Sequence, residues 1–386
     1  MAELMISADD HIDLGYLPSD LWTERLPASL KERGPRVVEQ PNGTEQWVCD
    51  GHPWGEWRAG KWFHNPKRRK IALDRFYQEE NFTRRPTTAE LRLQDMERDG
   101  VEASLMFPPI FGMRTIDREL AKTIIATYND WAADFAKASP QRLFSIAQLY
   151  PDDAEASTEE LLRVAKLGIK QVNFLVGTVT SAMYQPEWDR FWDAAQDADV
   201  IVSYHVGGVT REGTAFIDLE REAKTERKPA FGMGLGDGAT TFFNPFVGLF
   251  THGVLERRPK LKVVLGESGI GWIPFVVQEM DYRFKQTSTG GARDASLNPA
   301  IYPLKKLPSE VFREQVWATY QQDLVGLHLI DFFGDGHIMW ASDYPHPDST
   351  WPNSQAVVER ETAHLDPATK RKVLRENAAK LYGLAA

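Results

Sequence analysis

The stretch Met5-Ile-Ser-Ala-Asp-Asp-His-Ile-Asp13 begins as a short apolar run and ends in a cluster of acidic residues and a histidine. The run has the length and composition of a buried strand. An open, doubly wound sheet would be expected to carry a glycine-rich, phosphate-binding turn after its first strand. Here the strand leads into Asp9, Asp10 and His11 instead, and this favours a different parallel architecture.

Seven further runs of strand length follow along the chain, separated by helical or loop stretches. The eight expected strands are Met5–Ala8, Ser104–Phe107, Phe144–Leu149, Gln171–Val176, Val200–His205, Lys262–Gly266, Val316–Tyr320 and Ile338–Ala341. Apolar strands that alternate with amphipathic helices are typical of a parallel sheet covered by helices. Eight such units match a closed (β/α)8 TIM barrel of the α/β class.

Two connections are longer than usual, at about residues 18–87 and 207–259, after the first and fifth strands. Loops that follow the strands of a barrel lie on its catalytic face. We therefore expect one barrel domain over residues 1–386, with both insertions covering an active site.

Composition narrows the function classes. The formal charge of −10 excludes a generically basic nucleic-acid-binding surface, and 42% hydrophobic residues suffice for a large core. Apolar runs near the ~20 residues of a membrane span are missing, as is a secretory signal pattern, so a cytoplasmic protein with no membrane partner is expected. The single cysteine, Cys49, cannot build a cysteine-rich metal site.

Four polar residues lie at or near the carboxyl ends of three expected strands: Asp9 and His11 on the first, His205 on the fifth and Asp343 just after the eighth. Residues two apart on a strand share one face, so Asp9 and His11 should both point into the barrel. All four should meet at its carboxyl-terminal mouth. Such a set without thiolate suits zinc, manganese or iron, with an open position for water or a small-molecule substrate.

Beyond these residues, several longer stretches carry a family resemblance. They are Ser7-Ala-Asp-Asp-His, Leu93-Gln-Asp-Met-Glu-Arg-Asp-Gly-Val, Pro259-Lys-Leu-Lys-Val-Val-Leu-Gly-Glu-Ser-Gly-Ile-Gly-Trp-Ile-Pro, Trp340-Ala-Ser-Asp-Tyr-Pro-His and Glu376-Asn-Ala-Ala-Lys-Leu-Tyr-Gly. The chain resembles the amidohydrolase-related family over nearly its whole length. This branch of the amidohydrolase superfamily includes aminocarboxymuconate-semialdehyde decarboxylase and the resorcylate-type decarboxylases.

The resemblance implies a metal-dependent (β/α)8 barrel that assembles as a homodimer. It places Asp9, His11, His205 and Asp343 on the family's metal-ligand positions and makes Asp343 an acid/base as well. After the sixth strand, the decarboxylases usually have a histidine, whereas this chain has Glu267.

Glu267 leaves two interpretations open. A glutamate can transfer a proton beside one divalent ion, or it can bind the metal and even bridge two ions. His346 and Asp13 could complete such a two-metal cluster. Alternatively, each could hydrogen-bond a metal-binding residue without binding the metal itself. One ion is expected, and two are the alternative.

Substrate-binding residues are weaker predictions. Arg75, Arg84, Arg85 and Arg114 follow the first and second strands on the expected catalytic face, where an arginine could grip a carboxylate. Apolar pocket walls could come from Trp54, Trp57, Trp62 and Trp272.

The leading hypothesis is a metal-dependent decarboxylase, a carbon–carbon lyase, of an aromatic or unsaturated carboxylic acid, with Asp343 or Glu267 transferring the proton. The alternatives are a metal-dependent hydrolase of an amide, ester or lactone, a nonheme diiron monooxygenase on the same fold, and a catalytically silent metal-binding protein.

Overall fold

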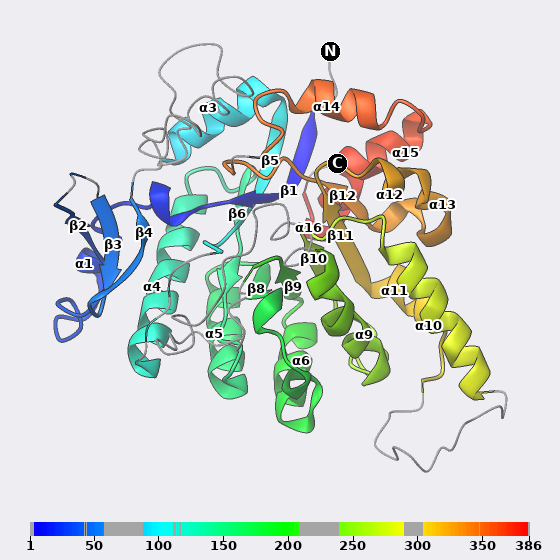
Figure 1. Ribbon diagram of the computed structural model, residues 1–386, viewed down its shortest axis with the longest axis horizontal. Helices are drawn as coiled ribbons and strands as arrows, with labels where there is room; N and C mark the ends of the chain where they lie inside the picture. The colour runs from blue at the N-terminus through cyan, green and yellow to red at the C-terminus, as the bar shows by residue number, and fades with distance from the viewer. Residues whose placement is uncertain are drawn as a thin grey trace.

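Parallel strands form a ring at the centre of the computed structural model, and helices surround it (Figure 1). The structure describes residues 4–41, 43, 45–57, 88–110, 113, 115, 117–207, 239–288, 304–346 and 348–384. The barrel strands are β1 (Met5–His11), β5 (Val101–Phe107), β6 (Leu143–Ser145), β7 (Ala147–Gln148), β8 (Gln171–Leu175), β9 (Ile201–His205), β10 (Val263–Gly266), β11 (Val316–Tyr320) and β12 (Ile338–Trp340). The predicted (β/α)8 architecture is confirmed.

Two parallel sheets share the ring, with strand orders β1-β5-β6 and β12-β11-β10-β9-β8-β7. Two backbone hydrogen bonds join the β12 end of one sheet to β1 of the other. Asp343 N donates to Asp9 O at 2.9 Å, and His11 N donates to Tyr344 O at 2.7 Å, which links the segment after β12 to β1. The strands therefore follow one another around the ring in the order of the sequence. Their carboxyl ends all lie at the same end of the barrel, which is its mouth.

The eight expected strands are all present, with small differences in their bounds. The third, Phe144–Leu149, is divided at Ile146, because its first half pairs with β5 and its second half pairs with β8. The first strand runs on to His11, and its register with β5 shifts between Ser7 and Asp10. Such irregularities are common beside active sites, where they redirect side chains.

The helices form the outer layer of the molecule. They are α1 (Leu21–Arg25), α3 (Ala89–Asp99), α4 (Arg118–Ala136), α5 (Ala154–Lys166), α6 (Asp189–Asp197), α9 (Phe243–Thr251), α10 (Ile273–Ser288), α11 (Pro308–Gln315), α12 (Leu324–His328), α13 (Ile330–Phe333), α14 (Ser354–Glu361), α15 (Pro367–Arg371) and α16 (Asn377–Tyr382). Short 3-10 helices lie at Leu14–Tyr16, Val176–Thr178, Ser181–Tyr184, Pro186–Trp188, Ala239–Phe242 and Asp335–His337, and a π-helical turn lies at Lys372–Glu376.

Local sequence explains how several of these helices begin and end. The Thr88 hydroxyl accepts a hydrogen bond from Leu91 N at the start of α3, and Gly100 ends that helix with a φ of 75°. Asp366 caps α15 by accepting from Ala368 N and Thr369 N. Among the described residues, no helix is long and apolar enough to cross a membrane.

The first insertion contains an antiparallel sheet that the sequence did not reveal. It consists of β2 (Arg36–Glu39), β3 (Glu45–Cys49) and β4 (His52–Glu56), and it lies beside the barrel at the left of Figure 1. Trp47 is buried in it and packs edge-on against Trp22 of α1, with ring centroids 5.0 Å apart. In the second insertion, the described part includes α9, whose Phe246 and Phe250 are buried.

Candidate metal centre

Polar side chains gather at the mouth of the barrel, where several strands end. Asp9 and His11 come from the end of β1 and His205 from the last position of β9. Glu267 follows β10, and Asp343 and His346 follow β12. These residues are spread over more than 300 positions of the sequence, and the ring of strands brings them together.

Asp9, His11 and His205 form one compact group of possible ligand atoms. Asp9 Oδ1 lies 3.2 Å from His205 Nε2 and 3.6 Å from His11 Nε2. These separations are those of neighbouring ligands around one ion, because nitrogen and oxygen ligands bind divalent metals at about 2.0–2.2 Å.

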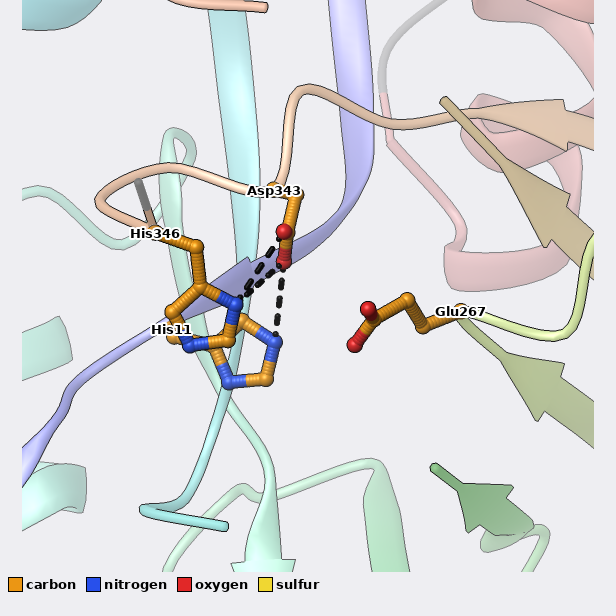
Figure 2. Close-up of side chains that lie close together, drawn as sticks. All are labelled: His11, Glu267, Asp343 and His346. Atoms are coloured by element: carbon orange, nitrogen blue, oxygen red, sulfur yellow. Dashed lines mark hydrogen bonds and ion pairs between the residues drawn. The ribbon is translucent and has the colours of Figure 1, made fainter. Parts of the chain in front are cut away.

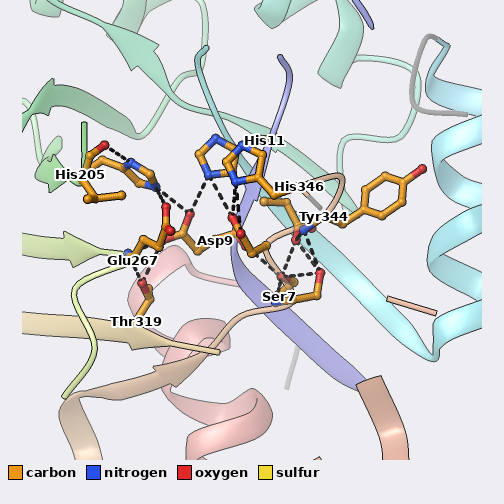
Figure 3. A network of polar contacts seen from close by, with 12 residues as sticks. Ser7, Asp9, His11, His205, Glu267, Thr319, Tyr344 and His346 are labelled. Atoms are coloured by element: carbon orange, nitrogen blue, oxygen red, sulfur yellow. Dashed lines mark hydrogen bonds and ion pairs between the residues drawn. The ribbon is translucent and has the colours of Figure 1, made fainter. Parts of the chain in front are cut away.

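Hydrogen bonds from behind orient this group. The Thr319 hydroxyl on β11 donates to Asp9 Oδ2 at 2.8 Å, and Glu267 N donates to the same oxygen at 2.6 Å. Oδ1 is thereby turned toward the histidines (Figure 3). The Nδ1 of His205 lies 2.8 Å from Val206 O, to which it donates, so Nε2 is left to bind a metal.

A second group consists of His11, Glu267, Asp343 and His346. Figure 2 shows Glu267 reaching toward the other three from the opposite side of the mouth. Asp343 Oδ1 lies 3.2 Å from His11 Nε2 and 3.0 Å from His346 Nδ1. The two imidazoles stack, with ring centroids 4.0 Å apart. The sequence predicted Asp343 to join Asp9, His11 and His205, and the compact group that contains it in the structure is His11, Glu267, Asp343 and His346.

Asp13 lies on the opposite edge of the His346 ring from Asp343. Its Oδ2 lies 3.3 Å from His346 Nε2, and Nδ1 on the other edge of the ring faces Asp343. Glu267 Oε2 also lies 3.6 Å from His205 Nε2, so Glu267 reaches both groups.

Two of the clustered carboxylates occupy an unusual backbone conformation. Glu267 has a φ of 50° and Asp343 a φ of 60°, in the left-handed region that residues with a side chain rarely adopt. Such a conformation costs about 1–3 kcal/mol and tends to persist at functional sites. Each carboxylate is therefore held at a strand end in spite of its backbone preference.

Burial and neighbouring charges move the pKa values in different directions. Burial, reinforced by Asp343, raises the pKa of Glu267 to about 8. Burial alone would also raise the pKa of Asp343, but His346 and His11 hold it below its usual range. Burial opposes charge on His346, yet Asp343 and Asp13 raise its pKa well above its usual value. Asp343 and His346 thus form an ion pair, with Oδ1 and Nδ1 3.0 Å apart, while burial opposes the ionisation of Glu267.

One observation of the structure supports a bound metal ion in this cluster. Among the described residues, Nδ1 of His11 and Oε2 of Glu267 are buried without a hydrogen bond, whereas His11 Nε2 and Asp343 Oδ1 face each other at 3.2 Å. Buried polar atoms normally have partners, because leaving them unsatisfied is costly. Histidine and carboxylate donors are the ligands that zinc, manganese and iron accept.

A neighbouring network fixes the backbone of the site, and sequence reasoning missed it. Asp10 points away from His11 and accepts hydrogen bonds from Ser7 at 2.7 Å and Ser342 at 2.6 Å. Arg92 of α3 is fully buried and donates to the carbonyl of His11 at 2.8 Å. The sequence does contain a signal for this network. Asp9 and Asp10 are adjacent, and neighbouring residues of a strand point to opposite faces, so Asp10 had to face away from Asp9.

The predicted substrate contacts are only partly visible. Arg75, Arg84, Arg85, Arg114 and Trp62 lie outside the described residues. Three other tryptophans are engaged in packing. Trp272 donates to Ser268 O at 2.9 Å and stacks on Phe243, Trp57 donates to Leu17 O, and Trp54 packs edge-on against Trp22. Trp272 is five residues from Glu267, which places it beside the mouth.

The fold and this cluster define a class of protein: a metal-binding (β/α)8 barrel with histidine and carboxylate ligands. Residues 48–384 match the amidohydrolase family model, and the chain belongs to this family.

Relatives with known names agree with that membership. The γ-resorcylate decarboxylase of Rhizobium sp. (strain MTP-10005) is 25% identical over 317 residues, which cover 76% of this chain and 87% of that protein. The crystal structure of an amidohydrolase from Mycobacterium avium subsp. paratuberculosis K-10 has a TM-score of 0.73 at 18% identity, and the match covers 100% of this chain and 99% of the other.

A third similar structure is that of 5-carboxyvanillate decarboxylase from Novosphingobium aromaticivorans DSM 12444, with bound manganese and 3-methoxy-4-hydroxy-5-nitrobenzoic acid. It has a TM-score of 0.63 at 19% identity, and the match covers 99% of this chain and 98% of that one.

Proposed function

We propose that this protein is a divalent-metal-dependent decarboxylase that removes the carboxyl group of an aromatic acid as carbon dioxide. The observation that carries the proposal is the buried cluster of histidine and carboxylate ligand atoms at the mouth of the barrel. The similarity to decarboxylases of hydroxylated benzoates, one of them with manganese, supports the substrate class and the metal.

The cation of this enzyme is assigned to Asp9, His11 and His205. Their ligand atoms lie together, and Thr319 and Val206 orient two of them. A divalent cation in this position supplies a Lewis acid for the oxygens of the substrate. The rigid strand ends hold the three ligands in place before the substrate arrives.

Loss of carbon dioxide from an aromatic acid requires a proton at the ring carbon that carried the carboxyl group. Asp343 and Glu267 are the carboxyl groups of the cluster available for this transfer. Asp343 is held between His11 and His346, whereas Glu267 Oε2 has no hydrogen bond among the described residues. We assign the proton transfer to Glu267 in the enzyme that carries one cation, with Asp343 fixing the two imidazoles.

A second candidate function is oxygenation at a pair of iron ions. One observation favours it: the possible ligands form two overlapping groups rather than one, and the second group adds Glu267, Asp343 and His346. Carboxylate and imidazole ligands suit iron.

Release of carbon dioxide tests the proposed function. Protein freed of metal by a chelator is reloaded with Mn²⁺ and incubated with 2,6-dihydroxybenzoate and with 5-carboxyvanillate, and carbon dioxide and the phenolic product are measured without and with oxygen. We expect product from the reloaded protein, none from the metal-free protein, and no effect of oxygen. Turnover that requires oxygen would favour the second candidate, and turnover without any metal would contradict both.

A control variant separates the assigned cation from metal bound elsewhere. His205→Ala removes one ligand of the first group, and His364→Ala removes an exposed histidine that stacks on His328. The first variant should lose activity and the second should retain it.

A further inference from the structure

We infer that Asp323 is a positioning residue of the active site, whose carboxylate fixes the turn that presents Glu267 to the mouth of the barrel. This turn, residues 267–272, follows β10 and leads into α10. Asp323 lies in the next connection of the barrel, between β11 and α12. The role of Glu267 in proton transfer rests on the proposed function, whereas the contacts of Asp323 do not depend on it.

Both carboxylate oxygens of Asp323 accept hydrogen bonds from the backbone. Oδ2 accepts from Ile270 N at 2.6 Å and from Gly271 N at 2.7 Å, and both donors belong to the turn that carries Glu267. Oδ1 accepts from Gly326 N at 2.8 Å, in the first turn of α12. Hydrogen bonds to an ionised carboxylate are stronger than those between neutral groups. One side chain therefore joins two successive connections of the barrel.

Glycines allow the two connections to approach each other closely. A Cβ atom on Gly271 would lie 3.0 Å from Asp323 Oδ1, and a Cβ atom on Gly326 would lie 2.8 Å from Gly271 N. Gly269 has a φ of 63°, which favours glycine, and a Cβ atom there would lie 3.3 Å from Asp323 Oδ2. The turn is thus built to fit around the carboxylate of Asp323.

The other end of the turn is held by β11. The Thr319 hydroxyl accepts from Glu267 N at 2.7 Å, and the two residues lie side by side in Figure 3. Glu267 has a φ of 50°, and a strained conformation of this kind persists only where surrounding contacts enforce it. Ile270, near the far end of the turn, is fully buried. Thr319 and Asp323 therefore hold the turn from both ends and fix the direction of the Glu267 side chain.

Capping of α12 alone does not account for the contacts of Asp323. A helix cap needs one side-chain oxygen, and Oδ1 fills that role by accepting from Gly326 N. Oδ2 is used entirely by the turn, which belongs to a different connection. Loss of the carboxylate should therefore affect the geometry around Glu267 as well as the start of α12.

Hydrogen exchange tests whether Asp323 holds the turn. Asp323→Asn keeps the shape of the side chain, but only one of the two terminal atoms of asparagine can accept a hydrogen bond, so it cannot serve both connections. The control Asp366→Asn changes an exposed aspartate that accepts from Ala368 N and Thr369 N at the start of α15. Amide exchange in residues 267–272, measured by mass spectrometry, should become roughly 10-fold faster in Asp323→Asn and stay unchanged in the control.

Kinetics of the Mn²⁺-loaded protein test whether the turn positions Glu267. In Asp323→Asn, kcat for 2,6-dihydroxybenzoate should fall roughly 10–100-fold, the effect expected of a misplaced reacting group. KM and Mn²⁺ affinity should be retained, because the assigned ligands Asp9, His11 and His205 lie on β1 and β9. In a Glu267→Gln background, Asp323→Asn should have no further effect, because the group that it positions is already gone.

Gly271→Ala provides a second variant in case Asp323→Asn does not fold, and circular dichroism verifies the fold of each. It crowds the same contact while Asp323 stays in place, so it should also speed exchange and lower kcat. Unchanged exchange in a folded variant, or losses that multiply in the double variant, would overturn the role of Asp323. Unmodified protein that releases no carbon dioxide would overturn the proposed function instead, and the exchange measurement, which needs no turnover, would then decide the role of Asp323 by itself.

Discussion

At the scale of single residues, the site depends on side chains that turn the ligands in the right direction. Asp9 has two carboxylate oxygens, and only Oδ1 faces the histidines. Oδ2 is held by the Thr319 hydroxyl and by Glu267 N. Outer hydrogen bonds of this kind typically contribute a factor of ~10–100 to metal affinity.

Thr319→Val tests this role with little change in shape. The valine keeps the volume of threonine but removes the hydroxyl donor, so Mn²⁺ affinity measured by calorimetry should fall by roughly 10–100-fold while the fold is retained. Thr362→Val is the matched control, because Thr362 is a buried threonine whose hydroxyl donates to the α14 backbone at Val358 O and, among the described residues, to no group of the site. Equal affinity in both variants would show that Thr319 does not orient Asp9.

At this scale the sequence pointed to ionisable residues at strand ends and not to the residues that support them. Asp9, His11, His205 and Asp343 were found because ionisable groups at strand ends are unusual. Thr319 was missed because threonine is common in strands and carries no charge. Arg92 was missed because a helix arginine is normally exposed, and only the folded chain shows its side chain buried against the His11 carbonyl.

At the scale of elements, the helices are tied to one another as well as to the barrel. Asp99, the last residue of α3, accepts hydrogen bonds from the backbone and hydroxyl of Ser354 at the start of α14. Burial raises the pKa of Asp99 to about 7, since Ser354 offsets only part of the lost hydration. This carboxyl group is therefore protonated in the folded protein at a pH where the unfolded chain is ionised.

The pH dependence of unfolding should reveal that contact. Because the folded pKa is raised, the stability that Asp99 contributes is complete below its usual pKa near 4 and is lost as the pH rises toward 7. At about 1.4 kcal/mol per pH unit, the loss amounts to a few kcal/mol at most. Asp99→Asn should flatten the fall in unfolding free energy between pH 4 and 7, measured with urea.

The control for this measurement is Asp20→Asn, since Asp20 is exposed and makes no capping hydrogen bond with its side chain. It should leave the slope unchanged. An Asp99→Asn profile parallel to that of the unmodified protein would mean that Asp99 titrates alike in the folded and unfolded chains.

Sequence periodicity captured the barrel strands, where apolar runs are a strong signal. It did not capture β2, β3 and β4. These strands are short, lie between glycine and proline residues and include charged positions such as Arg36 and Glu45. These strands pair with one another, and Trp47 is buried against Trp22, only in the folded chain. Local propensity does not encode such tertiary contacts.

At the scale of the whole molecule, the barrel joins residues from both ends of the chain into one site. Asp343 N bonds to Asp9 O where the ring closes, so the first and last strands hold ligands beside each other. A cation that binds this arrangement, and not the unfolded chain, must stabilise the fold.

Thermal unfolding should reflect this linkage. Free Mn²⁺ at 100 times its dissociation constant should add about 2.7 kcal/mol to the unfolding free energy, and a chelator should remove the gain. In differential scanning calorimetry, the midpoint of unfolding should rise with Mn²⁺ in the unmodified protein and much less in His205→Ala. An equal rise in both would place the stabilising ion elsewhere.

The central claim is that the mouth of the barrel binds a divalent cation through Asp9, His11 and His205, and crystallography tests it most directly. Crystals loaded with Mn²⁺ are measured near the manganese absorption edge, and an anomalous difference map locates the metal. We predict a peak within about 2.0–2.3 Å of Asp9 Oδ1 and the Nε2 atoms of His11 and His205. A map without a peak among these three residues, from crystals that carry manganese elsewhere, would contradict the account.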